Sequence, residues 1–264
     1  NGATVLLASL EAAVKRALSE LESEENTENV KLLKKVDLLD HGDVVYIRVF
    51  QPGSDLVVDP MTGTSSLIAA ALKHRYKGRV DVHPPLVSED PASDLKKEID
   101  LLKKRGKRNF YIEVYFHGIK TKFSSDTDFS FSSISSIVER NTDSHFTLNT
   151  IACYGAGMRE GMLAEYKKKP QLADRLNVFL QQKPYTVAMT SGTAKPGYID
   201  GEQYIAYPFH LAGALFDTQN NPTYGAAAYY SDRETKKYTP NNPESLVGDK
   251  LIATSQSQTQ TPNT

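Results

Sequence analysis

Short apolar runs alternate with amphipathic helical segments along this chain, and that alternation restricts the possible folds more than any other feature. Runs of β-branched and aromatic residues predict strands at 43–50, 78–83, 109–116, 146–152 and 185–190. Apolar residues at helical spacing predict helices at 64–76, 93–105, 134–140, 159–182 and 203–216. Strands that are apolar throughout are typical of a parallel sheet covered on both faces. We therefore expect an α/β fold with three layers (α/β/α) and a mostly parallel central sheet.

The ends of the chain differ in character from this central part. Residues 3–23 predict an amphipathic helix and do not resemble a signal peptide, and residues 24–30 are polar. The last residues form a low-complexity polar sequence. We expect an N-terminal helix and linker at 1–35, one globular domain at 36–235, and a disordered polar tail at 236–264.

Charge and composition exclude several classes of function. The formal net charge is −1, so the chain lacks the basic character of a nucleic-acid or anionic-membrane binder. No apolar run is long enough to span a membrane. A single cysteine, Cys153, rules out an internal disulfide and fits a reducing compartment. We expect a cytoplasmic protein, or one delivered into a host cell as an effector.

Two of the predicted strands end in residues that can perform chemistry. His117-Gly118 follows the strand at 109–116, and Cys153 follows the strand at 146–152. In a parallel sheet, reactive groups lie just beyond the carboxyl ends of the strands. A cysteine nucleophile needs an imidazole that accepts its proton, because the thiolate is the attacking species. If the two strands are neighbours, His117 and Cys153 emerge at the same edge of the sheet.

These motifs resemble those of the caspase-like (clan CD) cysteine peptidases, in which one apolar strand ends in His-Gly and the next in Ala-Cys. The matching segments here are FYIEVYFHG and FTLNTIACYGAG. YTVAMTSGTAKPGYIDG at 185–201 is similar to the caspase strand that ends in a Ser/Thr-rich turn and Pro-Gly-Tyr. GSDLVVDPMTGTSSLIAAAL at 53–72 is similar to the loop and helix after the first caspase strand. The resemblance covers roughly residues 43 to 216.

The resemblance implies a reaction and a role for each residue. Cys153 would be the nucleophile of a cysteine endopeptidase that hydrolyses peptide bonds through an acyl-enzyme. His117 would be the general acid/base, and the N–H groups of Gly118 and Cys153 would form the oxyanion hole. The chemistry needs no cofactor, and the partner would be a protein or peptide substrate, with any activator unidentified.

The resemblance also implies a pocket for the residue before the cut. Its residues would come from the turn after the first strand and from the loop at 190–200: Gln51, Asp55, Ser191, Gly192, Tyr198 and Asp200. Caspases that cut after Asp are expected to have arginines in these two places, where this chain has Gln51 and Tyr198-Ile199-Asp200. Asp55 and Asp200 instead favour a basic residue, as in the clostripain, gingipain and metacaspase relatives.

Two alternatives remain open. Gly155, Gly157 and Gly161 follow a strand and open a helix, which superficially fits a Rossmann-like nucleotide-binding loop, although the usual fingerprint spaces its last glycine one residue closer. Its acidic partner would be Asp174, which lies inside a predicted helix. The other alternative is a catalytically silent caspase-like interaction scaffold, in which Cys153 would be a buried small hydrophobe.

The remaining histidines and basic residues suggest no further site. We expect no metal site, because His41, His74, His83 and His210 have no metal-ligand spacing. His145 precedes the cysteine strand, so we expect it at the surface of the opposite sheet edge. Basic clusters at 105–108 and 167–169 are interpreted as solvated helix ends.

Overall fold

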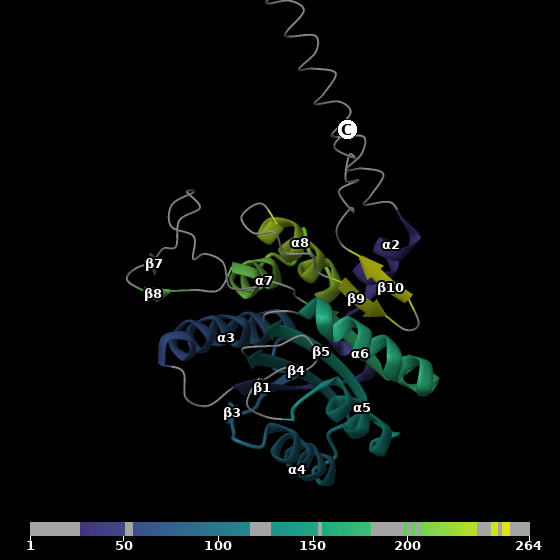
Figure 1. The fold of residues 1–264 in the computed structure, drawn as a ribbon. Coiled ribbons are helices and arrows are strands. Elements are labelled where there is room, and N and C mark those ends of the chain that lie inside the picture. Colours follow the sequence, from purple (N-terminus) through teal and green to yellow (C-terminus); the bar gives the residue numbers. More distant parts are fainter. Residues whose placement is uncertain are drawn as a thin grey trace, which may run out of the picture.

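The computed structural model describes residues 27–50, 55–116, 128–152, 155–180, 198–199, 202–203, 206–236, 244–247 and 250–253, and these residues form an α/β protein built on a mixed, mostly parallel sheet (Figure 1). The strands of the main sheet have the following bounds: β1 Val44–Phe50, β2 Val80–Val82, β3 Leu86–Val87, β4 Asn109–Phe116, β5 His145–Ala152, β6 Leu176–Leu180, β9 Glu244–Val247 and β10 Lys250–Ala253. A separate small hairpin pairs β7 (Tyr198–Ile199) with β8 (Glu202–Gln203).

The order of the main sheet is β10-β9-β6-β5-β4-β1-β2, and β3 also pairs with β1. All pairs from β2 to β6 are parallel, whereas β6–β9 and β9–β10 are antiparallel. Every residue of β1 and β4 is buried, as expected for parallel strands that are covered on both faces. The sequence-based prediction of a mostly parallel sheet is therefore confirmed for the described strands.

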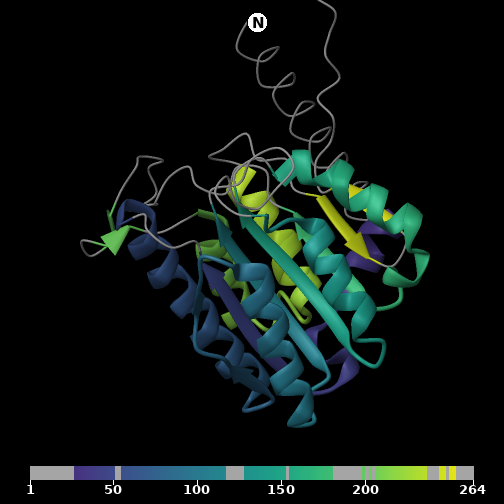
Figure 2. The ribbon, with the colours of Figure 1, turned by 60° about the horizontal axis from the view of Figure 1, so that its bottom comes forward.

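Helices lie on both faces of this sheet. Their bounds are α2 Glu28–Lys35, α3 Asp55–Tyr76, α4 Pro91–Lys104, α5 Phe131–Arg140, α6 Gly155–Lys168, α7 Ala206–Phe216 and α8 Tyr224–Lys236, with 3-10 turns η1 (Leu38–His41) and η2 (Pro170–Leu172). In Figure 1, α7 and α8 lie above the strands and α4 lies below them. Figure 2 shows blue-green helices in front of the sheet and the yellow-green helices behind it.

Alternation along the strands divides the apolar core into two clusters. Even-numbered β1 residues such as Tyr46 pack with Tyr111 and Ile151 against α2, α3, α7 and α8. Odd-numbered β1 residues such as Ile47 pack with Ile112 against α4, α5 and α6. We refer to the first side as the α8 face and to the second as the α4 face.

Local sequence signals explain where the helices begin. Thr27 caps α2 by accepting a hydrogen bond from the Val30 N–H (3.3 Å). Asp90 caps α4 by accepting from the Ser93 N–H (3.1 Å), and Pro91 occupies the first helical position, where no N–H is needed. The α4 helix thus begins two residues before the predicted start at 93.

Three predictions from the sequence need correction. Residues 28–30 belong to α2, although we expected a linker at 24–30. The helix expected at 159–182 ends at Lys168, and residues 176–180 form β6 because this apolar run pairs with β5. The helix expected at 64–76 already begins at Asp55.

The C-terminal part contributes more structure than we expected. Residues 244–247 form β9, which pairs with β6, and residues 250–253 form β10, although we assigned both to a polar tail. The α8 helix was also not predicted. The predicted helix at 3–23, the predicted strand at 185–190 and residues 254–264 lie outside the described residues. None of the helices in the described ranges is long and apolar enough to cross a membrane.

Candidate active-site edge of the sheet

The two strands that precede the candidate catalytic residues are direct neighbours. β4 and β5 pair in parallel over their whole length, from Asn109 opposite His145 to Phe116 opposite Ala152. β1 lies on the other side of β4, with Phe50 opposite Tyr115. The carboxyl ends of all three strands are therefore nearly level at one edge of the sheet.

Most of the predicted site residues lie outside the described residues. His117 and Gly118 come directly after β4, and Cys153 comes directly after β5. The pocket residues Gln51, Ser191, Gly192 and Asp200 also lie outside. Asp55 is the first residue of α3 and Tyr198 belongs to β7, but only their backbones are described. The structure thus describes the platform below the candidate site.

That platform contains a row of polar residues within the apolar core. Arg48 of β1, Glu113 of β4 and Asn149 of β5 occupy the same level, because Arg48 pairs with Glu113 and Glu113 with Asn149. Glu113 and Asn149 are fully buried and Arg48 is 8% exposed. Buried polar groups normally have hydrogen-bond partners, so such a row requires a matching network.

Glu113 is the centre of this network. Its carboxyl accepts hydrogen bonds from the hydroxyls of Tyr46, Tyr111 and Tyr115, the last at 2.7 Å. The Asn149 amide donates to the same carboxyl (3.2 Å). We call these five residues the Glu113 cluster. Four donors on one carboxyl satisfy both of its oxygen atoms inside the core.

A further contact connects the Glu113 cluster to α8. The Tyr111 and Tyr224 hydroxyls are 2.7 Å apart, and their rings meet edge to face at 5.1 Å. Tyr224 begins α8 and also packs edge to face on Phe179 of β6. The cluster therefore holds α8 on the sheet as well as joining β1, β4 and β5.

Burial governs the protonation of this cluster. It raises the pKa of the Glu113 carboxyl, and the hydrogen bonds donated by Tyr111, Tyr46 and the other partners offset only part of that rise. Burial, assisted by the nearby Glu113 carboxyl, also raises the pKa of the Tyr46, Tyr111 and Tyr115 hydroxyls well above 10. The tyrosines therefore remain protonated donors at any physiological pH.

Arg48 carries a positive charge into the same region. Its Nη2 donates to the His83 carbonyl (3.2 Å), and its guanidinium lies 5.6 Å from the Tyr46 ring centre. Among the described residues, no carboxylate forms an ion pair with it, and its Nε is buried without a hydrogen-bond partner. The His83 ring is held separately, by Glu98 of α4 (2.8 Å).

At the edge side of the Glu113 cluster, its member Tyr115 forms an aromatic pair with Phe50. The rings of Phe50 and Tyr115 stack with their centres 4.9 Å apart and their planes 11° from parallel. Both residues are buried on the α8 face, next to Ile151 of β5. They form the uppermost described layer on this face: Phe50 is the last residue of β1, and Tyr115 and Ile151 are the last but one of β4 and β5.

The Glu113 cluster was not predicted from the sequence. Its signal was present, because each of three mostly apolar strands has a strongly polar residue in its interior, in VVYIRVF, NFYIEVYF and HFTLNTIA. A charged residue is almost never fully buried unless it has a partner. A search for paired polar residues at matching strand positions would have found Glu113 and Asn149.

The glycines of the nucleotide-binding alternative lie within a helix. Gly155 and Gly157 belong to the first turn of α6 and Gly161 to the second. A β-carbon at Gly161 would contact nothing within 4 Å, so no close backbone approach requires glycine there. Asp174 lies in the turn before β6, whereas the fingerprint places its acidic residue at the end of the following strand.

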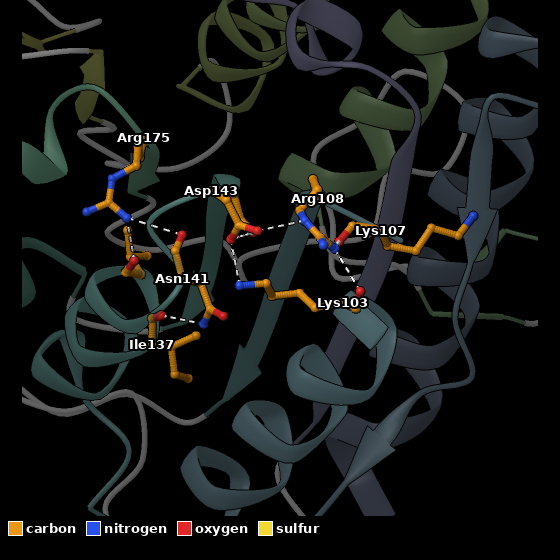
Figure 3. Close-up of polar contacts among 9 residues, drawn as sticks. Lys103, Lys107, Arg108, Ile137, Asn141, Asp143 and Arg175 are labelled. Carbon is orange, nitrogen blue, oxygen red and sulfur yellow. Dashed lines mark hydrogen bonds and ion pairs between the residues drawn. The ribbon is translucent and has the colours of Figure 1, made fainter. Parts of the chain in front are cut away.

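Two residues of the basic cluster before β4, Lys107 and Arg108, form ion pairs within the protein (Figure 3). Asp143 lies between Lys103 and Arg108 and pairs with both, at 2.6 and 2.8 Å. Arg108 Nη1 also donates to the Lys103 carbonyl (2.7 Å), and Lys107 pairs with Asp81 (3.2 Å). Two of the three basic residues at 105–108 are therefore paired within the protein.

The second basic cluster also forms ion pairs within the protein. Lys169 pairs with Glu139 (2.8 Å) and Glu165 (3.0 Å). Among the described residues, no three His, Cys, Asp or Glu side chains are arranged to hold a metal ion. His145 lies at the amino end of β5, the opposite edge from Cys153.

The ion pairs of Asp143 predict a dependence of stability on acid. The hydrogen bond from Lys103, together with the charge of Arg108, holds the pKa of the Asp143 carboxyl at about 2. Its folded pKa lies below the ordinary value, so its contribution is complete above about pH 4 and is lost as the pH falls towards 2. In thermal unfolding at low salt, the midpoint temperature of wild type should be higher than that of Asp143→Asn at pH 6. This difference in midpoint temperature should disappear near pH 2. A difference independent of pH would contradict this assignment.

The comparisons with known proteins assign no family. No protein-family model matches the chain, and no curated protein sequence matches it significantly.

Proposed function

We propose that this protein is a cysteine endopeptidase of caspase-like, three-layer architecture. Cys153 is the nucleophile that forms the acyl-enzyme, and His117 is the acid/base that takes the thiol proton and returns a proton to the leaving amine. The N–H groups of Gly118 and Cys153 stabilise the oxyanion. The substrate is a protein or peptide.

The observation that carries this proposal is the pairing of Phe116 with Ala152 at the ends of two parallel strands. Paired residues on adjacent strands have Cα atoms about 4.8 Å apart. His117 and Cys153 each follow a paired residue directly, and consecutive Cα atoms are about 3.8 Å apart. The Cα atoms of His117 and Cys153 therefore cannot be more than about 12 Å apart, a range in which the two side chains can meet.

The direction of the strands adds independent support. Both candidate residues follow carboxyl ends of parallel strands, where α/β proteins bind ligands. The alternation that puts Tyr115 and Ile151 on the α8 face would direct His117 and Cys153 to that same face. The rigid, buried platform below them suits a reaction that depends on precise positioning.

The residue before the cut would be selected by charge. Asp55 and Asp200 would favour a basic residue, and Asp55 begins α3 only five residues after the end of β1. The nearby charged residue of the platform, Arg48, forms no ion pair among the described residues. Probes that carry a basic or an acidic side chain next to the reactive group therefore test this preference directly.

Covalent labelling tests the proposal. The protein is incubated with peptidyl acyloxymethyl ketones that carry Arg, Lys, Asp or Leu next to the reactive group, and the intact mass is measured. We expect one adduct on wild type, fastest with Arg or Lys. We expect no adduct on Cys153→Ala, and at pH 7 His117→Ala should react at least about a hundredfold more slowly.

His74→Ala provides the matched control, because His74 is an exposed histidine of α3 far from the strand ends in sequence. This variant should be labelled like wild type. If no probe labels wild type while iodoacetamide still modifies Cys153, the protein is not an active peptidase under those conditions and the scaffold alternative gains. Equal labelling of wild type and His117→Ala would refute the role of His117.

A further inference from the structure

Two histidine rings are stacked at the edge of the sheet opposite the candidate active site. His41 is the last residue of η1, and His145 is the first residue of β5. Their ring centres are 3.5 Å apart and their planes are within 5° of parallel. Together with Asn109, Asp174 and Arg175 they line a polar cavity of about 190 Å³. This stack joins segments that are far apart in the sequence.

The stack has little capacity for positive charge. Histidine is the side chain whose charge ordinarily changes between pH 5 and 8. Two imidazolium rings at 3.5 Å would repel each other strongly, and the Arg175 guanidinium at the same cavity adds to that repulsion. In addition, the Nδ1 atom of His145 is buried and has no hydrogen-bond partner among the described residues.

The carboxylates near the stack bind other partners, and among the described residues none forms an ion pair with His41 or His145. Asp37, on the same 3-10 segment as His41, accepts hydrogen bonds from the Tyr76 hydroxyl and two backbone N–H groups. Asp40 accepts from the Asp37 N–H, and Asp143, in the turn before β5, is paired with Lys103 and Arg108. The remaining carboxylate, Asp174, is exposed and directly precedes Arg175, which carries the opposite charge.

We propose that the His41–His145 stack is an acid-sensitive clasp that accepts one proton but opens when a second proton binds. This proposal concerns the stability and conformation of the protein, and it does not depend on the proposed peptidase activity.

The contacts of η1 determine what opening would release. The Asp37 carboxylate accepts from the Tyr76 hydroxyl of α3 (2.5 Å) and from the Tyr224 N–H of α8 (3.2 Å). The Asn109 amide of β4 donates to the carbonyls of Leu38 (2.7 Å) and Gly42 (3.0 Å). η1 therefore connects α3 and α8 to the sheet, and opening of the clasp loosens both helices.

The direction of the pH effect follows from the pKa of His145. Burial, followed by the neighbouring His41 and Arg175, lowers this pKa below its ordinary value of about 6.5. Between the pKa of His145 in the folded protein and about pH 6.5, His145 is therefore protonated in the unfolded chain but not in the folded protein. Stability falls as the pH falls through this window.

Urea unfolding between pH 5 and 8 tests the clasp. His41→Phe and His145→Phe keep a flat ring in the stack but remove one titrating group. Each proton taken up on unfolding changes the unfolding equilibrium constant up to tenfold per pH unit. We expect this dependence in wild type below pH 6.5 and a clear reduction in both variants. His74→Phe, which changes a histidine outside the clasp, should keep the wild-type dependence.

Imidazole NMR titration gives a second readout that needs no unfolding. In His41→Phe the pKa of His145 should rise relative to wild type, and in His74→Phe it should not change. Two histidines that titrate independently near pH 6.5 in wild type would overturn the proposal. The same pH dependence of unfolding in wild type and His41→Phe would overturn it as well.

Discussion

Replacing Gly225 by alanine should destabilise the protein by about 3 kcal/mol, although the same exchange usually stabilises a helix. Gly225 is the second residue of α8, where α2 crosses closely. A β-carbon there would lie 1.9 Å from the Leu33 carbonyl oxygen and 3.2 Å from the Val36 carbonyl oxygen. Both are backbone atoms, so α2 or α8 must move as a whole.

That movement would also break hydrogen bonds that hold α2 on α8. The Gly225 N–H donates to the Val36 carbonyl (2.8 Å), and the Thr223 hydroxyl donates to the Lys34 carbonyl. We expect Gly225→Ala to shift the urea midpoint downward without a change of slope, which would indicate a loss of stability with the fold retained.

Gly213 provides the matched control. It lies within α7, and a β-carbon there would contact nothing within 4 Å. Gly213→Ala should therefore show only the helix preference for alanine, a gain of up to about 1 kcal/mol. If both alanine variants are equally stable, the close approach of α2 to α8 does not exist in solution.

The sheet could be predicted from the sequence because its strands carry a strong local signal. NFYIEVYF at 109–116 was predicted to the residue, since β-branched and aromatic residues dominate the segment between a basic turn and His-Gly. The strand at 176–180 was missed because a five-residue, mostly apolar segment after a helix fits either structure. Its pairing with β5 decides the outcome, and sequence periodicity does not contain that information.

Long-range contacts also explain the missed C-terminal elements. α8 has few strongly apolar residues apart from alanine and tyrosine, yet Ala227 and Ala228 are fully buried. Small residues let this helix approach the sheet and α2 closely, so its burial depends on its neighbours. The sequence of β9 lies within a polar segment, but the strand is held by backbone pairing with β6.

The candidate site was predictable in part. The positions of His117 and Cys153 after adjacent strands required only the order of strands and helices, and the pairing of Phe116 with Ala152 is consistent with it. The Glu113 cluster could not be assembled from single strands, because its members come from β1, β4 and β5. Only the sheet order brings these side chains together.

Removal of the Glu113 carboxyl should destabilise the protein by roughly 4 kcal/mol in Glu113→Leu. Leucine leaves the hydroxyls of Tyr46, Tyr111 and Tyr115 and the Asn149 amide without their common acceptor. Each buried donor that loses its partner costs about 1 to 3 kcal/mol, and the added apolar burial returns only part of this. Glu113→Gln keeps one acceptor oxygen and should cost about 1 to 2 kcal/mol.

A double-mutant cycle separates the network from simple packing. Tyr115→Phe should be destabilising in wild type, because it removes the 2.7 Å hydrogen bond to Glu113. In the Glu113→Leu background the same exchange should be neutral or stabilising, because it removes a hydroxyl that has lost its acceptor. If the cost of Tyr115→Phe is the same in both backgrounds, the two residues are not coupled.

The pH dependence of Glu113→Gln distinguishes the charge of the carboxyl from its shape. Burial raises the folded pKa of Glu113, so between about pH 4.5 and that value the folded protein keeps a proton that the unfolded chain has lost. In this window stability falls as the pH rises, which is opposite in sign to the effect of the histidine clasp. The stability of wild type should therefore exceed that of Glu113→Gln most strongly at low pH. Urea midpoints of the two proteins, measured from pH 4.5 upward, should converge as the pH rises. A constant difference would mean that Glu113 has an ordinary pKa and that the cluster holds a carboxylate.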